Sequence, residues 1–252
     1  MVLPTVSIIG KLVVSSMLAV VSVVHLSFWQ PGASLHRLRT SASNGHSINP
    51  VKVVACVEAL CPDCREFLSK QIVPTYQMLG SSVIDLEVVV FGNAQIIDES
   101  DESHSLDQPK KVECQHGVAE CDANTYEQCA IHLYPYPERY LPFLTCLDET
   151  LPHRYNRDEP MDASLFAKCA RFSALDFESI AACHNDPEMA WKLNVEASKK
   201  TPDNHQYVPW IVINGLHGMD EEKESFVDAV CKAYRAAGGN HPACSSSSHL
   251  LG

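Results

Sequence analysis

Two cysteines separated by two residues, Cys61 and Cys64, follow an apolar run at residues 51–57 and precede a helical pattern. Two thiols at this spacing, where a strand meets a helix, are typical of reversible thiol–disulfide chemistry. A helix N-terminus presents unpaired N–H groups and a partial positive charge, which stabilise a thiolate on the first cysteine. We therefore predict that Cys61 is the nucleophile and that Cys64, one turn away, displaces the bound partner.

Glu58 stands at the end of the same apolar run and could carry a proton to or from Cys64. The competing interpretation is a solvated carboxylate at a strand end, which is the more common situation. Asp63, if ionised, opposes a thiolate on Cys61, so the spacing alone does not determine the redox potential.

The elements around these residues predict an α/β fold. The first half reads as a strand at 51–57, a helix at about 62–79 and a strand at 82–91. Pro74 falls inside the helical pattern and should either kink the helix or end it. From about 124 to 200 the pattern is that of four or five short helices, with N-cap signals at Asp162, Asp176 and Asp186.

The second half reads as a strand at 207–213, a turn at Asn214-Gly215 and an amphipathic helix at 221–237. This order predicts a thioredoxin-like fold with a helical, disulfide-stapled insertion at about 93–206 between its two halves. In such folds a proline that opens the second-half strand lies beside the reactive cysteine. We expect a cis bond at Val208-Pro209 and a substrate-positioning role for both residues, the alternative being a trans proline at a strand start.

Composition narrows the class of protein. A chain of 252 residues with 46% hydrophobic content can bury one sizeable core. The net charge of -12 and the lack of a basic stripe disfavour nucleic acid as a partner. Eleven cysteines with a single C-x-x-C pair lack the second half of a zinc ribbon and indicate an oxidising compartment instead.

The ends of the chain carry signals of their own. Residues 1–29 contain a long apolar stretch that predicts a signal peptide or a retained signal-anchor, and only the second would make a membrane a partner. Residues 30–48 read as a flexible linker, 49–244 as the thioredoxin-like domain, 98–111 as a polar loop and 245–252 as a disordered tail.

The segment from Cys114 to Cys129 reads C-Q-H-G, two residues, E-C, two residues, N, four residues, C. This pattern resembles the signature of the gamma-interferon-inducible lysosomal thiol reductase family. The residues that precede Cys61, the run at 91–95 and the Val208-Pro209-Trp210 segment are also similar to that family, so the resemblance covers about residues 50–244.

The resemblance implies an enzyme that reduces disulfide bonds of protein substrates in an acidic compartment, with Cys61 and Cys64 in the redox roles. It implies no bound cofactor or metal, and an external small-thiol or protein electron donor. The expected location is the secretory pathway, then the lysosome or vacuole or the outside of the cell. The chain departs from the family because it contains no Asn-x-Ser/Thr sequon, so N-glycan-dependent sorting cannot operate on it.

Nine cysteines remain outside the redox pair. Cys56 lies in the predicted first strand, and we expect a buried free thiol that acts as a small hydrophobe. The other eight could form four structural disulfides, with Cys231–Cys244 the easiest pair to propose: Cys114, Cys121, Cys129, Cys146, Cys169, Cys183, Cys231 and Cys244. An alternative for the signature is a metal site of Cys114, His116 and Cys121, although these ligands fit no standard zinc spacing.

Two other functions compete with the reductase. A disulfide oxidase or isomerase would use the same pair at a more oxidising potential. A non-catalytic thioredoxin-like module would bind clients in the groove at Pro209, independently of both thiols.

Overall fold

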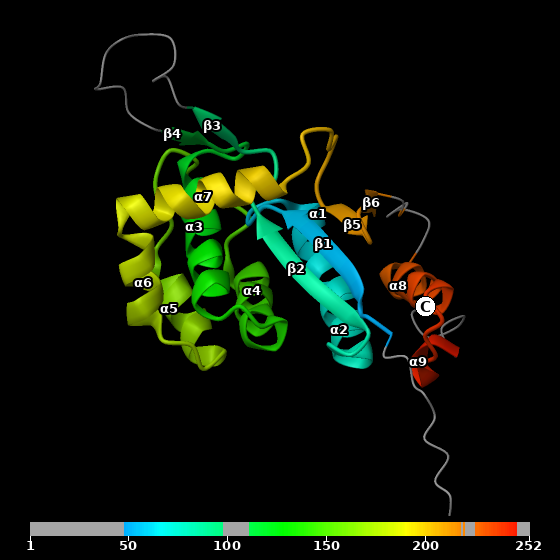
Figure 1. Ribbon diagram of the computed structural model, residues 1–252. Helices are drawn as coiled ribbons and strands as arrows, with labels where there is room; N and C mark the ends of the chain where they lie inside the picture. Colours follow the sequence, from blue (N-terminus) through cyan, green and yellow to red (C-terminus); the bar gives the residue numbers. More distant parts are fainter. Residues whose placement is uncertain (1–47, 98–110, 218, 220–224, 246–252) are drawn as a thin grey trace, which may run out of the picture. The chain divides into compact units, whose positions relative to one another are not determined.

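The computed structural model describes residues 48–97, 111–217, 219 and 225–245 (Figure 1). Its main sheet has four strands in the order β2 (Ile84–Val90), β1 (Val51–Val57), β5 (Trp210–Ile213) and β6 (Leu216–His217). β1 runs parallel to β2 and antiparallel to β5, and β5 runs antiparallel to β6. The two halves predicted from the sequence therefore meet side by side in one sheet.

A long helix connects β1 to β2. It begins as α1 (Pro62–Phe67), widens into a π-helical turn at Leu68–Ile72 and ends as α2 (Val73–Leu79). The Val73 N–H bonds the Leu68 carbonyl, a five-residue spacing. Pro74 follows at once, and since it has no N–H to donate and its ring needs space, the wider turn lets the helix continue past it. The expectation that the helix might stop at Pro74 is therefore wrong.

Both faces of the sheet are covered, which explains why β1 is apolar at nearly every position. One face, which includes Val53 and Ala55, joins the main core with the β1–β2 helix and with α8 (Phe226–Ala236). The other face carries Cys56, which packs beside Trp210 and the α7 helix (Pro187–Lys200). Cys56 is a free, fully buried thiol, and burial raises its pKa to about 11, so it stays neutral.

The described residues of the insertion include five helices, of which α3 and α7 pack against β2 (Figure 1). Besides α7 they are α3 (Val118–Leu133), α4 (Pro137–Thr150), α5 (Ala163–Phe172) and α6 (Phe177–His184). The predicted caps Asp162, Asp176 and Asp186 each accept a backbone N–H from the first turn of the helix that follows.

Several predicted boundaries need correction. The polar segment was expected to be all loop, but a small hairpin of β3 (Gln95–Ile97) and β4 (Lys111–Glu113) flanks it. The β5 ladder begins at Trp210, not at Tyr207, because Pro209 has no N–H to donate. Ser245, assigned to the tail, ends the short helix α9 (Pro242–Ser245).

The α8 helix is shorter than predicted and begins after the N-cap Ser225. The N-terminal apolar segment, the linker up to residue 47, the loop 98–110 and the tail 246–252 lie outside the described residues. Within the described part of the chain, no helix has the length and apolar character needed to cross a membrane.

Candidate active site

Cys61 is the N-cap of α1, and Pro62 occupies the first helical position. The backbone at Cys61 is extended, with φ -71° and ψ 120°, so its side chain turns back over the first turn of the helix. There Sγ accepts the Cys64 N–H at 3.4 Å. The sulfur therefore takes the place that a Ser or Asp oxygen takes in an ordinary helix cap.

The two thiols differ in their acidity. A hydrogen bond from the Cys64 side chain lowers the pKa of Cys61 to about 7, helped by the backbone N–H groups of Cys64 and Asp63. Burial and the Asp63 charge oppose this shift. Cys64 is 2% exposed, and burial raises its pKa well above the ordinary value. One thiol is therefore ready to ionise while the other holds its proton.

Val208 and Pro209 lie beside the pair, as the sequence predicts. Their peptide bond is cis, and the Cys61 Sγ is 3.9 Å from the Val208 carbonyl oxygen. Next to them the Trp210 ring stacks on His217, with ring centroids 3.4 Å apart, and Tyr207 meets Trp210 edge-on. Sequence reasoning missed this aromatic group, although the residues on both sides of Val208-Pro209 are aromatic.

Glu58 is buried, with a side chain 1% exposed, so the expectation of a solvated carboxylate is wrong. Its Oε2 accepts the Asn93 N–H at 2.9 Å. Burial and the charge of Glu120 raise the pKa of Glu58 to about 7, against the opposing Asn93 hydrogen bond. Cys61 adds to the increase and His116 lessens it. Glu58 and Cys61 therefore titrate in the same pH range and influence each other.

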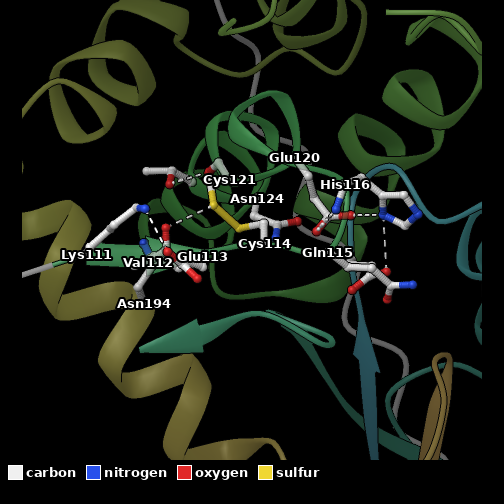
Figure 2. The surroundings of a disulfide bond; sticks show 12 residues. Lys111, Val112, Glu113, Cys114, Gln115, His116, Glu120, Cys121, Asn124 and Asn194 are labelled. Atoms are coloured by element: carbon white, nitrogen blue, oxygen red, sulfur yellow. Dashed lines mark hydrogen bonds and ion pairs between the residues drawn. A yellow bond between two sulfur atoms is a disulfide. The ribbon is translucent and has the colours of Figure 1, made fainter. Parts of the chain in front are cut away.

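Two residues of the signature, His116 and Asn124, contact the loop that carries Glu58, and a third, Glu120, bonds His116. His116 Nδ1 lies 3.5 Å from Glu58 Oε1 and hydrogen-bonds the fully buried Glu120, a contact drawn in Figure 2. Asn124 Oδ1 accepts the Ala59 N–H at 2.8 Å. Sequence reasoning missed these contacts. The available signal was the four-residue spacing of Glu120 and Asn124, which places both on one side of α3, with His116 in the turn just before the helix.

Among the described residues, Glu58, His116 and Glu120 bring three metal-ligating atoms within 4.8 Å of one another. In this arrangement His116 Nδ1 hydrogen-bonds Glu120 directly, and we assign no metal to the group. The alternative site of Cys114, His116 and Cys121 is wrong, because the two sulfurs form a disulfide with an S–S distance of 2.01 Å (Figure 2).

Comparison with known proteins gives a consistent answer. Residues 52–173 match the family model for gamma interferon inducible lysosomal thiol reductase. The chain is 32% identical over 203 residues to the gamma-interferon-inducible lysosomal thiol reductase of Carassius auratus, covering 77% of this chain and 72% of that one. It is 27% identical over 205 residues to a gamma-interferon-responsive lysosomal thiol protein of Arabidopsis thaliana, covering 79% and 78%.

This chain belongs to the gamma-interferon-inducible lysosomal thiol reductase family. It is a thiol–disulfide oxidoreductase, an enzyme that acts on disulfide bonds. Solved structures show the same fold at low identity: a Mycobacterium tuberculosis disulfide bond oxidoreductase, DsbG, in reduced form aligns with a TM-score of 0.55 and 17% identity over 80% of this chain and 84% of that one. Reduced DsbA of the same organism gives 0.53 and 16%, covering 78% and 86%. The predicted thioredoxin-like fold is confirmed.

The thioredoxin-like domain contains four disulfides, formed by the eight cysteines predicted to be structural. Besides Cys114–Cys121 they are Cys129–Cys183, Cys146–Cys169 and Cys231–Cys244. Cys129, the last cysteine of the signature, bridges to Cys183 of α6. The signature is therefore joined by one disulfide within itself and by another to a second helix of the insertion. Cys56, Cys61 and Cys64 are free.

Proposed function

We propose that this enzyme reduces disulfide bonds in other proteins at the Cys61–Cys64 pair. The Cys61 thiolate attacks one sulfur of the substrate disulfide, and the other substrate sulfur leaves as a thiolate that takes a proton from solvent. Cys64 then attacks Cys61 in the mixed disulfide. This step releases the second substrate thiol and leaves a Cys61–Cys64 disulfide, which an external thiol reductant reduces for the next turnover.

The observation that carries this proposal is the position of the Cys61 sulfur. It caps α1, accepts the Cys64 N–H at 3.4 Å and lies beside the Val208 carbonyl, so a nucleophile, its resolving partner and a peptide-binding backbone meet at one point. An extended substrate can pair with the backbone at Val208, because Pro209 takes no part in the strand ladder at that position. Val208 and Pro209 therefore position the substrate.

The moderate pKa of Cys61 supports a reductase over an oxidase. A stabilised thiolate favours the reduced form of the pair, so oxidants of this fold have a very acidic cysteine, with a pKa of about 3.5 in DsbA against about 7 in thioredoxin. The pKa of Cys61, about 7, lies at the thioredoxin end of this range. A measured Cys61–Cys64 potential near that of DsbA would support the oxidase instead.

An acidic lysosomal or vacuolar compartment is part of the proposal, in line with the names of the relatives. With a pKa of about 7, about 1% of Cys61 is thiolate at pH 5, roughly thirtyfold more than an ordinary cysteine would supply. Because the chain has no N-glycosylation sequon, delivery would use a route that does not read N-glycans.

The test is reduction of a disulfide-containing model protein at pH 5 and pH 7 with a small-thiol donor, comparing the wild type with Cys61→Ser and Cys64→Ser. We expect Cys61→Ser to abolish turnover and Cys64→Ser to accumulate a mixed disulfide that mass spectrometry locates at Cys61. Equal activity in wild type and Cys61→Ser would overturn the assignment. Client binding that persists in the double variant without any turnover by the wild type would point to the binding module.

A further inference from the structure

Two buried carboxylates, Glu120 of the signature and Glu58 of the loop before α1, lie beside a single imidazole nitrogen. His116 Nδ1 hydrogen-bonds Glu120 and faces Glu58 Oε1 at 3.5 Å. Glu58 and Glu120 have side chains 1% and 0% exposed, whereas His116 is 25% exposed. Glu58 Oε1 is buried and accepts no hydrogen bond from the described residues. His116 is therefore the member of this group that links the sealed carboxylates to solvent.

When two buried carboxylates lie so close to each other, they cannot both ionise without a compensating proton nearby. The His116 imidazole, whose Nδ1 bonds Glu120 and faces Glu58, supplies a site for such a proton. The Glu58 end of this set of three residues lies next to the redox pair. The Glu58 backbone hydrogen-bonds Cys64, and the Glu58 charge acts on both Cys61 and Cys64.

We propose that His116 and Glu120 are positioning residues that, together with Glu58, carry the proton of Cys64 to solvent during resolution of the mixed disulfide. This inference rests on the proposed function. The Cys64 S–H bond breaks and its proton goes to the Glu58 carboxylate. The Cys64 sulfur forms a bond to Cys61, and the Cys61–substrate S–S bond breaks with its electron pair on the substrate sulfur, which takes a proton from solvent.

Glu58 must then lose the proton it has accepted before the next cycle. Glu58 is sealed from water, so the proton passes to His116 and from its exposed ring to solvent. Glu120 holds the ring, because its two oxygens bond Nδ1 and the His116 backbone N–H. The disulfide Cys114–Cys121 brackets both residues and keeps them together (Figure 2).

Other charged or titratable groups also surround this set. Tyr155 interacts with both Glu120 and Glu58, and Arg157 of the same loop bonds the Gln115 carbonyl. Glu127 lies further along α3 and repels Glu120. Asn93 donates its backbone N–H to Glu58. None of these four residues is itself substituted in the variants below.

A small aromatic disulfide that releases a coloured thiol separates the two steps in a stopped-flow experiment. The first release reports attack by Cys61, and the second reports resolution by Cys64. We expect Glu58→Gln to slow the second release by about 100-fold, the lower range for loss of a general base, and to leave the first largely unchanged. His116→Asn, which keeps a hydrogen-bond donor but cannot carry a proton, should slow the second release about tenfold or more.

The pH profile of the second release separates a proton path from a purely structural role. Glu120→Gln removes a negative neighbour of Glu58 and should move the midpoint to lower pH. His116→Asn removes the group that favours ionised Glu58 and should move it to higher pH. Matched controls are the exposed residues His132→Asn on α3 and Glu113→Gln on β4, which should move neither rate nor midpoint.

Circular dichroism checks that each variant is folded. If either Glu120→Gln or His116→Asn fails to fold, the other still tests the proposal. A second release within twofold of wild type and an unmoved midpoint in both would overturn the proposal. A chelator that changes the rate of the second release in the wild type would also overturn it, because this result would show a metal site. Failure of Cys61→Ser to remove the first release would instead overturn the proposed function.

Discussion

Replacing Cys64 tests what makes Cys61 acidic. The largest contribution to the low pKa of Cys61 is the hydrogen bond from the Cys64 side chain, and Cys64→Ala removes it. The Cys64 backbone N–H at 3.4 Å remains. A hydrogen bond to a charged group is worth about 1.5–3 kcal/mol, which corresponds to about one to two pH units. We therefore expect the pKa of Cys61 to rise from about 7 to about 8–9.

The effect on rate is smaller than the effect on ionisation. At pH 6 the thiolate fraction of Cys61 would fall about 10- to 100-fold, but a more basic thiolate is also more nucleophilic, with a Brønsted coefficient of about 0.4–0.5. The rate of Cys61 attack on a small disulfide should therefore fall about 3- to 10-fold at pH 6. Above about pH 9 the order should reverse, with the variant faster than wild type.

The assay follows the first attack on a small disulfide from pH 5 to pH 10, with mass spectrometry to confirm that the label is on Cys61. Cys64→Ser is the matched control, since its hydroxyl can still donate, and its midpoint should stay within about half a unit of wild type. Cys56 should remain unlabelled because it is fully buried. A midpoint near 7 in Cys64→Ala would refute this account and assign the acidity to the helix terminus alone.

Three further predictions concern the groups that support the pair. Glu58→Gln should raise the Tm at pH 8 and change it little at pH 4. Because the pKa of Glu58 is raised to about 7 in the folded state, the free energy of unfolding of the wild type falls by up to about 3 kcal/mol as the pH rises from about 4 to 7. Glutamine does not ionise, so the variant does not lose this stability. Asn124→Ala should cost about 1–3 kcal/mol in urea unfolding, because the buried Ala59 N–H loses its acceptor. Gly92→Ala should destabilise more than Gly80→Ala, measured the same way: both have positive φ, but only at position 92 would a Cβ meet Glu58, 2.3 Å from Oε2.

Local patterns were enough to predict the framework of the redox centre. The run at 51–57 is continuously apolar because the strand is covered on both faces, and this pattern is visible in the sequence. The caps Asp162, Asp176 and Asp186 mark helix starts because each bonds backbone N–H groups only a few residues away. Elements that depend on distant contacts were missed or misjudged. Strands of three residues, such as β3 and β4, are too short to show a period, and the π-helical turn reflects how one proline is accommodated.

The environment of Glu58 could not be predicted from its neighbours in the sequence. Its burial depends on Asn93, 35 residues away, and on His116, 58 positions along the chain, which reaches the carboxylate only after the insertion has folded back. The partner of Cys129 was equally hidden, because Cys183 is 54 residues away and eight cysteines allow many pairings.

The signature segment contributes to the redox centre although none of its cysteines is free. The loop between β1 and α1 must hold Cys61 in extended backbone at a helix cap while it also buries Glu58, and a short loop has few internal hydrogen bonds for this. Asn124 supplies an acceptor for the loop at Ala59, and His116 faces the buried carboxylate. The disulfides at Cys114 and Cys129 fix both ends of the segment that carries these two side chains. The insertion therefore helps to hold the loop that precedes the Cys61–Cys64 pair.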